Sequence, residues 1–341
     1  MRLTKTLPVE PGQEFVIDRF RPEDAMGVAS LFLSVYGEHY PLPQYYDPEW
    51  LAAANAAGEI YSVIARTPGG DIVCHMGVYR SAAPNPALYE YGITLTLPAY
   101  RGRHASSRIA QYIAGMVPGL PLDGIYGEAV TTHTVTQKYS YEIKMIDTAF
   151  EIDLMPTEIY DAGKSAQGRV SCLFTFLSLK DAPHALHVPA RYLDAARFIL
   201  HAVPVERTIN AATALPAAER SRVETRIFDF AGVSRCQLAA CGEDIASVIA
   251  DMERQADEKR CTTRQVFLNL ADPAIGCAAE LLRERGYFLA GLTPRWFGSD
   301  GMLLQRMLHP PGFAHNELCR DRARQLLAMV EDDWRAVSGA A

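Results

Sequence analysis

The 341-residue sequence lacks several features that define membrane, secreted or nucleic-acid-binding proteins. No run of eighteen apolar residues occurs, so no membrane span is expected. Residues 1–13 contain no apolar stretch of the kind that forms the centre of a signal peptide. The formal net charge is −7, which leaves no excess of basic residues for a broad nucleic-acid-binding surface. We therefore expect neither a membrane nor a nucleic acid among the partners.

Cysteine and histidine are too sparse to predict a metal centre or a disulfide framework. The seven cysteines form no C-x-x-C pair, and His39 and His75 have no companion at the spacing of metal ligands. An odd number of cysteines suits free thiols in a reducing compartment. The sequence thus predicts a cytoplasmic protein without a metal site.

The composition is that of a globular chain with a substantial core. Apolar residues make up 49% of the sequence and charged residues 21%, so disorder is not the default. A chain of this length forms one very large domain or two ordinary ones. Residues 156–168 are polar and carry proline and glycine, which is typical of a linker.

The stretch from residue 88 to residue 110 has the strongest local pattern. Residues 89–97 are rich in β-branched and aromatic types and predict a mostly buried strand, which Pro98 ends. Small and basic residues follow at 100–107, and apolar residues then recur at helical spacing. Such a loop directs backbone N–H groups and a helix N-terminus toward one point. The stretch therefore predicts a site for an anion such as a phosphate or pyrophosphate.

The elements around this stretch alternate in a recognisable order. Strands are expected near residues 15–20, 61–66, 72–79, 123–130 and 146–154, and helices near 21–36 and 131–141. Together with Pro98-Ala99-Tyr100-Arg101-Gly102-Arg103, this order resembles the GNAT superfamily of acyl-CoA-dependent N-acyltransferases over residues 15–155. The resemblance implies an α/β (α+β) fold with a mixed, mostly antiparallel central sheet flanked by helices.

The resemblance also implies how the co-substrate, acetyl-CoA or another acyl-CoA, would be held. The backbone of residues 94–96 would pair with the pantetheine arm, and the loop that follows would cradle the pyrophosphate, with the two arginines adding charge. His104 and Ser106 stand where the family has glycine or another small residue. The expected binding residues are Thr94, Leu95, Thr96, Arg101, Gly102, Arg103, His104, Ala105, Ser106 and Ser107.

Candidate catalytic residues follow from the same resemblance. Glu90 lies eleven residues before Arg101, the spacing of the glutamate that serves as base in some members of the family, so Glu90 is the first choice for the base, directly or through a water. The alternative is a solvent-facing glutamate at a strand edge. The family's later asparagine and tyrosine positions fall on His133 and Ser140, so both standard residues are absent.

Two tyrosines flank the second of these positions. Tyr139 or Tyr141 would protonate the departing thiolate if the helix were shifted by one residue, or both are ordinary packing residues. His133 would be a ligand-facing donor, a second base or a structural residue. The tyrosine-rich segment 36–50 would line an acceptor pocket or cover the core.

The second half of the chain again resembles a GNAT fold. Residues 278–288, AAELLRERGYF, are similar to the family's last helix and the Gly-aromatic pair that follows it. The loop Cys241-Gly242-Glu243-Asp244 carries two acids that would repel a phosphate. We therefore expect a GNAT domain at 1–155, a linker at 156–168, a degenerate second GNAT-like domain at 169–341, and one active site in the chain.

The sequence predicts an N-acyltransferase, most simply an N-acetyltransferase, that transfers the acyl group by direct attack to an amine of a small molecule or a side chain. The alternative is a non-catalytic acyl-CoA-binding or ligand-sensing protein, which the absent asparagine and tyrosine favour. Transfer from aminoacyl-tRNA is disfavoured by the acidic balance. Neither the acceptor nor the oligomeric state follows from the sequence.

Overall fold

The computed structural model describes residues 2–157 and 168–339. Within these residues the chain forms eight α-helices and one sheet of twelve strands, in the order β1-β2-β3-β4-β5-β7-β6-β13-β14-β12-β11-β10. Most neighbouring strands are antiparallel, and the parallel pairs of this sheet are β4–β5 and β11–β12. The mixed, mostly antiparallel α/β architecture expected from the sequence is confirmed.

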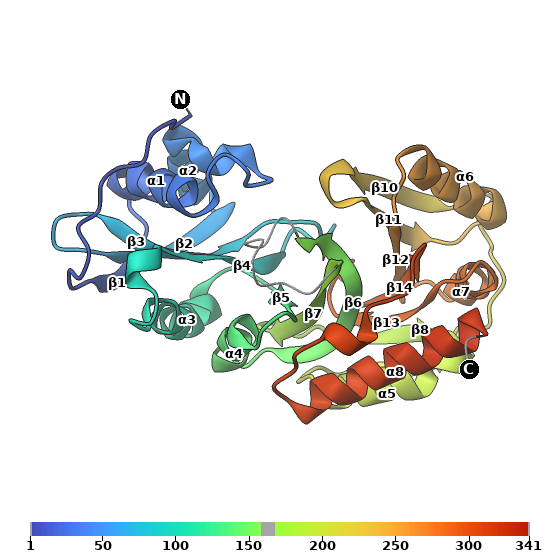
Figure 1. Ribbon diagram of the computed structural model, residues 1–341. Coiled ribbons are helices and arrows are strands. Elements are labelled where there is room, and N and C mark those ends of the chain that lie inside the picture. The colour runs from blue at the N-terminus through green and yellow to red at the C-terminus, as the bar shows by residue number, and fades with distance from the viewer. Residues whose placement is uncertain (1, 158–167, 340–341) are drawn as a thin grey trace.

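The first half of the sheet is flanked by helices on both faces. Its strands are β1 (Val16–Arg19), β2 (Ile60–Arg66), β3 (Ile72–Tyr79), β4 (Leu88–Thr96), β5 (Gly124–Val130), β6 (Ile146–Pro156) and β7 (Arg169–Ser178). Helices α1 (Ala25–Tyr36) and α2 (Pro48–Ala56) cover one face, and α3 (Ala105–Met116) and α4 (Val135–Glu142) cover the other (Figure 1).

Strand β7 differs from the sequence-based expectation. The pattern of residues 171–179 predicts the first strand of the second half, but β7 pairs with both β5 and β6 and completes the first half. The linker expected at residues 156–168 thus begins at the last residue of β6 and ends just before β7, and its residues 158–167 lie outside the described residues. We propose that the boundary between the halves falls after Leu179.

The second half repeats the strand pattern of the first. In spatial order its strands are β10 (Arg222–Phe228), β11 (Val233–Ala240), β12 (Thr263–Asn269), β14 (Gly301–Met307) and β13 (Phe288–Thr293). The successive pairs in this order are antiparallel, parallel, antiparallel and antiparallel. The pairs in the order β3, β4, β5, β7 and β6 of the first half have the same directions. The helices are α5 (Leu193–His201), α6 (Ile245–Glu258), α7 (Ile275–Glu284) and α8 (Asp321–Ser338), and β8 (His184–Val188) and β9 (Arg207–Ala211) form a separate parallel pair.

The two halves join edge to edge between β6 and β13. The strands pair at Ala149 and Gly291, where Gly291 has φ +139° and a Cβ would overlap the carbonyl oxygen of Thr148. Next to this contact the Gln305 side chain takes the place of a strand backbone: its amide donates to the Phe150 carbonyl at 3.0 Å and accepts from the Ile152 N–H at 3.0 Å. Glycine at 291 thus allows the sheet to continue across the joint.

An aromatic cluster packs across the same joint. Trp296 of the second half stacks on Phe267 with ring centroids 4.4 Å apart and meets Tyr126 and Phe174 of the first half edge-on. All four rings are fully buried. Because one cluster contains side chains from both halves, the halves share part of their core. No helix among the described residues is long and apolar enough to cross a membrane.

Candidate active site

Strands β4 and β5 separate after a short parallel ladder. Leu88 to Glu90 pair with Gly124 to Tyr126, but β4 continues to Thr96 and β5 to Val130 without pairing to each other. The inner edge of β4 therefore presents unpaired backbone groups beyond Glu90. In the second half the equivalent strands β11 and β12 pair at six positions, so no comparable opening forms there.

A bulge in β4 accompanies the opening. Ile93 has φ +54°, and the register with β3 shifts between His75 and Gly77. The His75 ring lies between the Ile93 carbonyl at 3.1 Å and the Ser62 hydroxyl at 3.0 Å, and burial lowers the pKa of His75 to about 4. A neutral imidazole thus supports the bulge from the core side.

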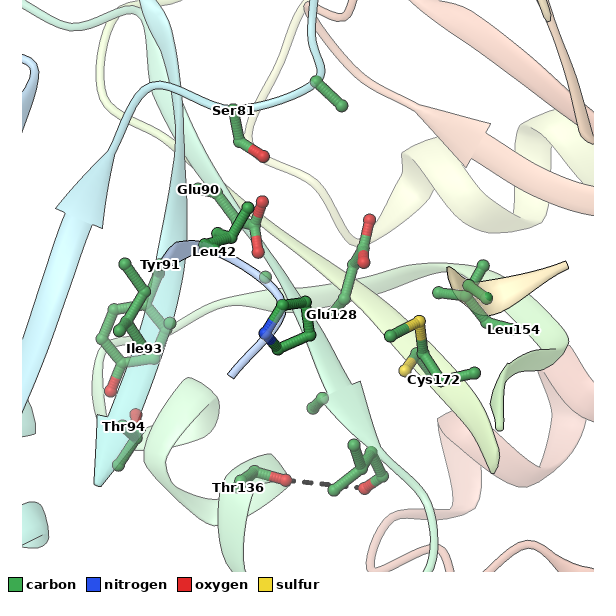
Figure 2. Close-up of a pocket in the computed structure, with 18 of the residues that line it drawn as sticks. Leu42, Ser81, Glu90, Tyr91, Ile93, Thr94, Glu128, Thr136, Leu154 and Cys172 are labelled. Carbon is green, nitrogen blue, oxygen red and sulfur yellow. Dashed lines mark hydrogen bonds between the residues drawn. The ribbon is translucent and has the colours of Figure 1, made fainter. Parts of the chain in front are cut away.

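A cavity of about 530 Å³ occupies the opening. Its walls come from β4, β5, α4, the β6 end, the segment after α1, and the β10–β11 hairpin of the second half. Figure 2 shows Glu90 and Glu128 on the neighbouring strands β4 and β5, with Ser81 beside Glu90 and Leu154 and Cys172 on the opposite wall. The second half therefore supplies part of the wall of a cavity that opens in the first.

Glu90 stands where the two strands begin to diverge. Its carboxylate accepts hydrogen bonds from the Tyr79 hydroxyl and, at 3.2 Å, from the Tyr126 hydroxyl. Burial, reinforced by the nearby carboxylate of Glu128, raises the pKa of Glu90 to about 7. A carboxylate with that pKa in a cavity is suited to accept a proton near neutral pH. Its role as base stays a prediction.

Three charged residues next to Glu90 were not expected from the sequence. Arg235 on β11 donates to Glu128 and to Glu151, each at 2.9 Å, and to Gln265 at 2.6 Å. Burial and the neighbouring Glu128 raise the pKa of Glu151 to about 8. The signal in the sequence was a single charge in each of two mostly buried strands, β5 and β11, whereas β6 carries Asp147 and Asp153 besides Glu151. In the described residues no group of three or more His, Cys, Asp or Glu side chains is arranged to hold a metal ion.

The loop before α3 exposes a row of backbone donors. Gly102 has φ +80°, and His104 caps the helix in the left-handed conformation at φ +60°, which is normally left to glycine. Within the described residues, no backbone N–H between Gly102 and Ser107 has a hydrogen-bond acceptor. The His104 side chain is exposed. Backbone N–H groups without acceptors at a helix N-terminus are suited to bind an anionic ligand.

The side chains of the expected binding residues have different surroundings. Thr94 lines the cavity, whereas Leu95 is buried in the core of the first half. The Thr96 and Ser106 hydroxyls lie 2.9 Å apart and bond to each other, so the small residue at 106 packs against β4. Of these residues, Thr94 is therefore the one that lines the cavity, and the pairing of residues 94–96 with a pantetheine arm stays a prediction.

The charged and polar side chains of the loop also differ from the expectation. Arg103 donates to the Gln13 carbonyl at 2.6 Å and so points toward the N-terminal segment. Ser107 donates to the Glu142 carboxylate of α4 at 2.9 Å. Arg101 is exposed and Ala105 is buried. Arg101 is therefore the arginine whose side chain is available to a phosphate.

Of the two candidate tyrosines only one reaches the cavity. Tyr139 lines it, while the Tyr141 hydroxyl donates to Asp147 at 2.9 Å and its ring lies under the Arg320 guanidinium. Tyr141 is therefore held away from the cavity by its contacts with Asp147 and Arg320, and its role as the acid stays a prediction. His133 lies on the cavity wall and is exposed, and its Nδ1 accepts the Val135 N–H at 3.3 Å.

Part of the tyrosine-rich segment lines the cavity and part of it is buried in the core. Tyr36, Tyr40 and Leu42 line the cavity, whereas Tyr45 and Tyr46 are buried in the core. The Tyr91 hydroxyl is buried on the cavity wall and has no partner in the described part of the chain. An unpartnered hydroxyl at this position is consistent with a polar ligand in the opening.

The equivalent loop of the second half is filled by the chain itself. The Gly242 N–H donates to the Ser221 hydroxyl at 2.9 Å, and the Ser221 N–H donates to Asp244 at 2.7 Å. A Cβ at Gly242 would overlap the backbone of Arg220. The start of α6 is thus occupied by residues 220–221, and only the first half keeps an accessible loop.

A mostly antiparallel sheet thus opens between two parallel strands, beside a helix N-terminus whose N–H groups are free in the described part of the chain. The chain is similar in structure to GNAT N-acetyltransferases. An N-acetyltransferase from Staphylococcus aureus matches 49% of this chain and 99% of its own length at 11% identity and a TM-score of 0.39. The ribosomal-protein-S18-alanine N-acetyltransferase of Escherichia coli matches 49% and 96% at 8% identity and a TM-score of 0.37.

The yncA protein of Salmonella typhimurium, solved with its cofactor acetyl-CoA, matches 49% of this chain and 94% of its own at 11% identity and a TM-score of 0.38. No family model and no curated protein sequence matches the chain. At these identities the similarity concerns the fold of about half the chain.

Proposed function

We propose that this protein is an acyl-CoA-dependent N-acyltransferase with a single active site, in the cavity between β4 and β5. The observation that carries the proposal is that Glu90 lies on the cavity wall where β4 and β5 separate, on the strand that leads along the chain to the free N–H groups before α3. The seven free cysteines agree with the reducing cytoplasm predicted from the sequence.

The residues present fit an acyl-CoA. The unpaired edge of β4 beyond Tyr91 offers backbone partners to the amides of a pantetheine arm, and the N–H groups of residues 102–107 offer donors to a pyrophosphate. When bound, acyl-CoA supplies an activated thioester. Acetyl-CoA is the simplest such co-substrate, and the length of the acyl chain stays open.

The chain's own residues would manage the protons. Glu90 accepts the proton that the attacking ammonium must lose, and Tyr79 and Tyr126 hold the carboxylate in place. Bond formation between nitrogen and the acyl carbon is matched by cleavage of the carbon–sulfur bond. The Tyr139 hydroxyl, on the cavity wall, is the proton donor for the departing sulfur.

The alternative, an acyl-CoA-binding protein without catalysis, is favoured by one observation: Ser140 stands at the family's acid position, and of the two flanking tyrosines Tyr141 is bonded to Asp147 and turns away. Release of free thiol in the presence of amines separates the two functions. A catalyst releases thiol only when an acceptor is present, whereas a sensor binds CoA and releases none.

Calorimetry with acetyl-CoA and CoA tests the binding step. Gly102→Ala should weaken binding because it places a Cβ at φ +80° in the donor loop, while Gly70→Ala, at φ +91° in the β2–β3 turn, is the matched control. We expect acetyl-CoA to bind about tenfold more weakly to Gly102→Ala than to the wild-type protein, and to bind Gly70→Ala with unchanged affinity. Absence of binding by the wild-type protein at millimolar acetyl-CoA contradicts the proposal.

A further inference from the structure

The part of the cavity nearest Glu90 is strongly acidic. Glu90 and Glu128 line it, and Glu151 shares the Arg235 guanidinium with Glu128, whereas Glu90 is bonded to two tyrosine hydroxyls and to no cation among the described residues. Arg235 is already bonded to Glu128, Glu151 and Gln265. This end of the cavity lacks the positive charge that would balance it, and an ammonium group would supply that charge.

The same cavity offers little positive charge to a negative group on the acceptor. Of its lining residues, Arg235 and His133 are the basic ones. The first is held by Glu128, Glu151 and Gln265, and the Nδ1 of the second already accepts the Val135 N–H. A carboxylate placed beside the amine would therefore lose its hydration without gaining a counter-charge.

The cavity also has an apolar and aromatic lining. Tyr36, Tyr40 and Leu42 come from the first half, and Phe228 and Phe230 from the second. Leu42 is 39% exposed and Phe230 51% exposed, so both have surface that a ligand could cover. An acceptor with an apolar or aromatic body would cover both side chains while its amino group reached Glu90.

We infer that the acceptor is a primary amine carried on an aromatic or apolar body and lacking a carboxylate, of the arylalkylamine type. This inference rests on the proposed function for its acyl-transfer step, but amine recognition by the acidic pocket and the Phe230 wall is a separate property of the structure. The second half thereby determines acceptor specificity.

The test compares four probes: phenethylamine, phenylalanine, propylamine and spermidine. Phenylalanine adds only a carboxylate to phenethylamine, and propylamine lacks the ring. Binding to the full-length protein is measured by calorimetry with and without CoA, and transfer from acetyl-CoA by thiol release. We expect kcat/KM for phenethylamine to exceed that for phenylalanine by a factor on the order of 100.

Two variants test whether Glu128 and Phe230 are the residues that produce the preference for phenethylamine. Glu128→Gln should weaken phenethylamine binding about tenfold, because a charged hydrogen-bond acceptor is lost. Phe230→Ala should weaken phenethylamine about fivefold and leave propylamine unchanged. Leu215→Ala, at a residue that is 80% exposed and lies away from the cavity, is the control and should change neither.

The outcomes separate the two proposals. Binding of phenethylamine that depends on Glu128 and Phe230, without thiol release, supports the amine site and removes the catalytic function. Thiol release with phenylalanine or spermidine as the better acceptor keeps the catalytic function and overturns the inferred acceptor class. Equal binding of all four amines, or binding of none, also overturns it.

Discussion

Replacement of Glu90 by glutamine tests the central step of the proposed reaction. Glutamine keeps the size of the side chain and an oxygen for the Tyr79 and Tyr126 hydroxyls, so the fold should persist. It cannot take a proton from an ammonium group. Loss of a general base typically costs a factor of about 10² to 10⁴, and we expect kcat to fall within that range.

The pH dependence gives the same prediction a quantitative form. With a pKa of about 7, the ionised fraction of the Glu90 carboxylate is about 9% at pH 6 and about 91% at pH 8. The wild-type kcat/KM should therefore rise roughly tenfold over that interval and level off above it. The inflection should disappear in the Glu90→Gln variant.

The assay is the initial rate of thiol release at saturating acetyl-CoA, measured from pH 5.5 to 9 (about seven points). Two acceptors whose amines differ in pKa serve as controls, since an inflection that belongs to Glu90 stays in place when the acceptor changes. A Glu90→Gln variant with a rate within about fivefold of wild type and an unchanged pH profile would refute the assignment.

Three further outcomes are expected. Glu142→Gln should tighten CoA binding about two- to fivefold by calorimetry, because it removes an exposed anion beside the start of α3; weaker binding would contradict a pyrophosphate there. Arg235→Met should lower the free energy of unfolding in urea by about 3–5 kcal/mol, because Glu151 is left buried without its partner, and an added Glu151→Gln should recover part of the loss. Tyr139→Phe should lower kcat about tenfold or more, whereas Tyr141→Phe should keep kcat within twofold and cost about 1 kcal/mol of stability; the reverse pattern would exchange their roles.

The local features of the first half were predictable from the sequence. The strand, proline, loop and helix expected at residues 88–110 correspond to β4 and α3, because each is determined by neighbouring residues: the β-branched run, Pro98 and the helical spacing of apolar residues. The expected α/β class and the similarity to GNAT N-acetyltransferases are also confirmed. The roles of Glu90 and of the loop residues stay predictions.

The features that depend on distant pairing were not predictable. Strand β7 is apolar along most of its length, which fits any central strand, and only its pairing with β5 and β6 shows to which half it belongs. Glu128 and Arg235 are 107 residues apart, so their contact left no local pattern. The choice between Tyr139 and Tyr141 depended on the orientation of α4, which the sequence did not determine.

The joint between β6 and β13 has a consequence for how the chain can be divided. Without the second half, β6 would become an edge strand with free backbone groups, and Phe150, Ile152 and Leu173 would lose the apolar cover that they share with it. An uncovered apolar edge promotes pairing between chains and aggregation. The second half therefore covers an edge strand of the half that holds the cavity, and a fragment ending at residue 180 should self-associate even though it contains strands β1 to β7.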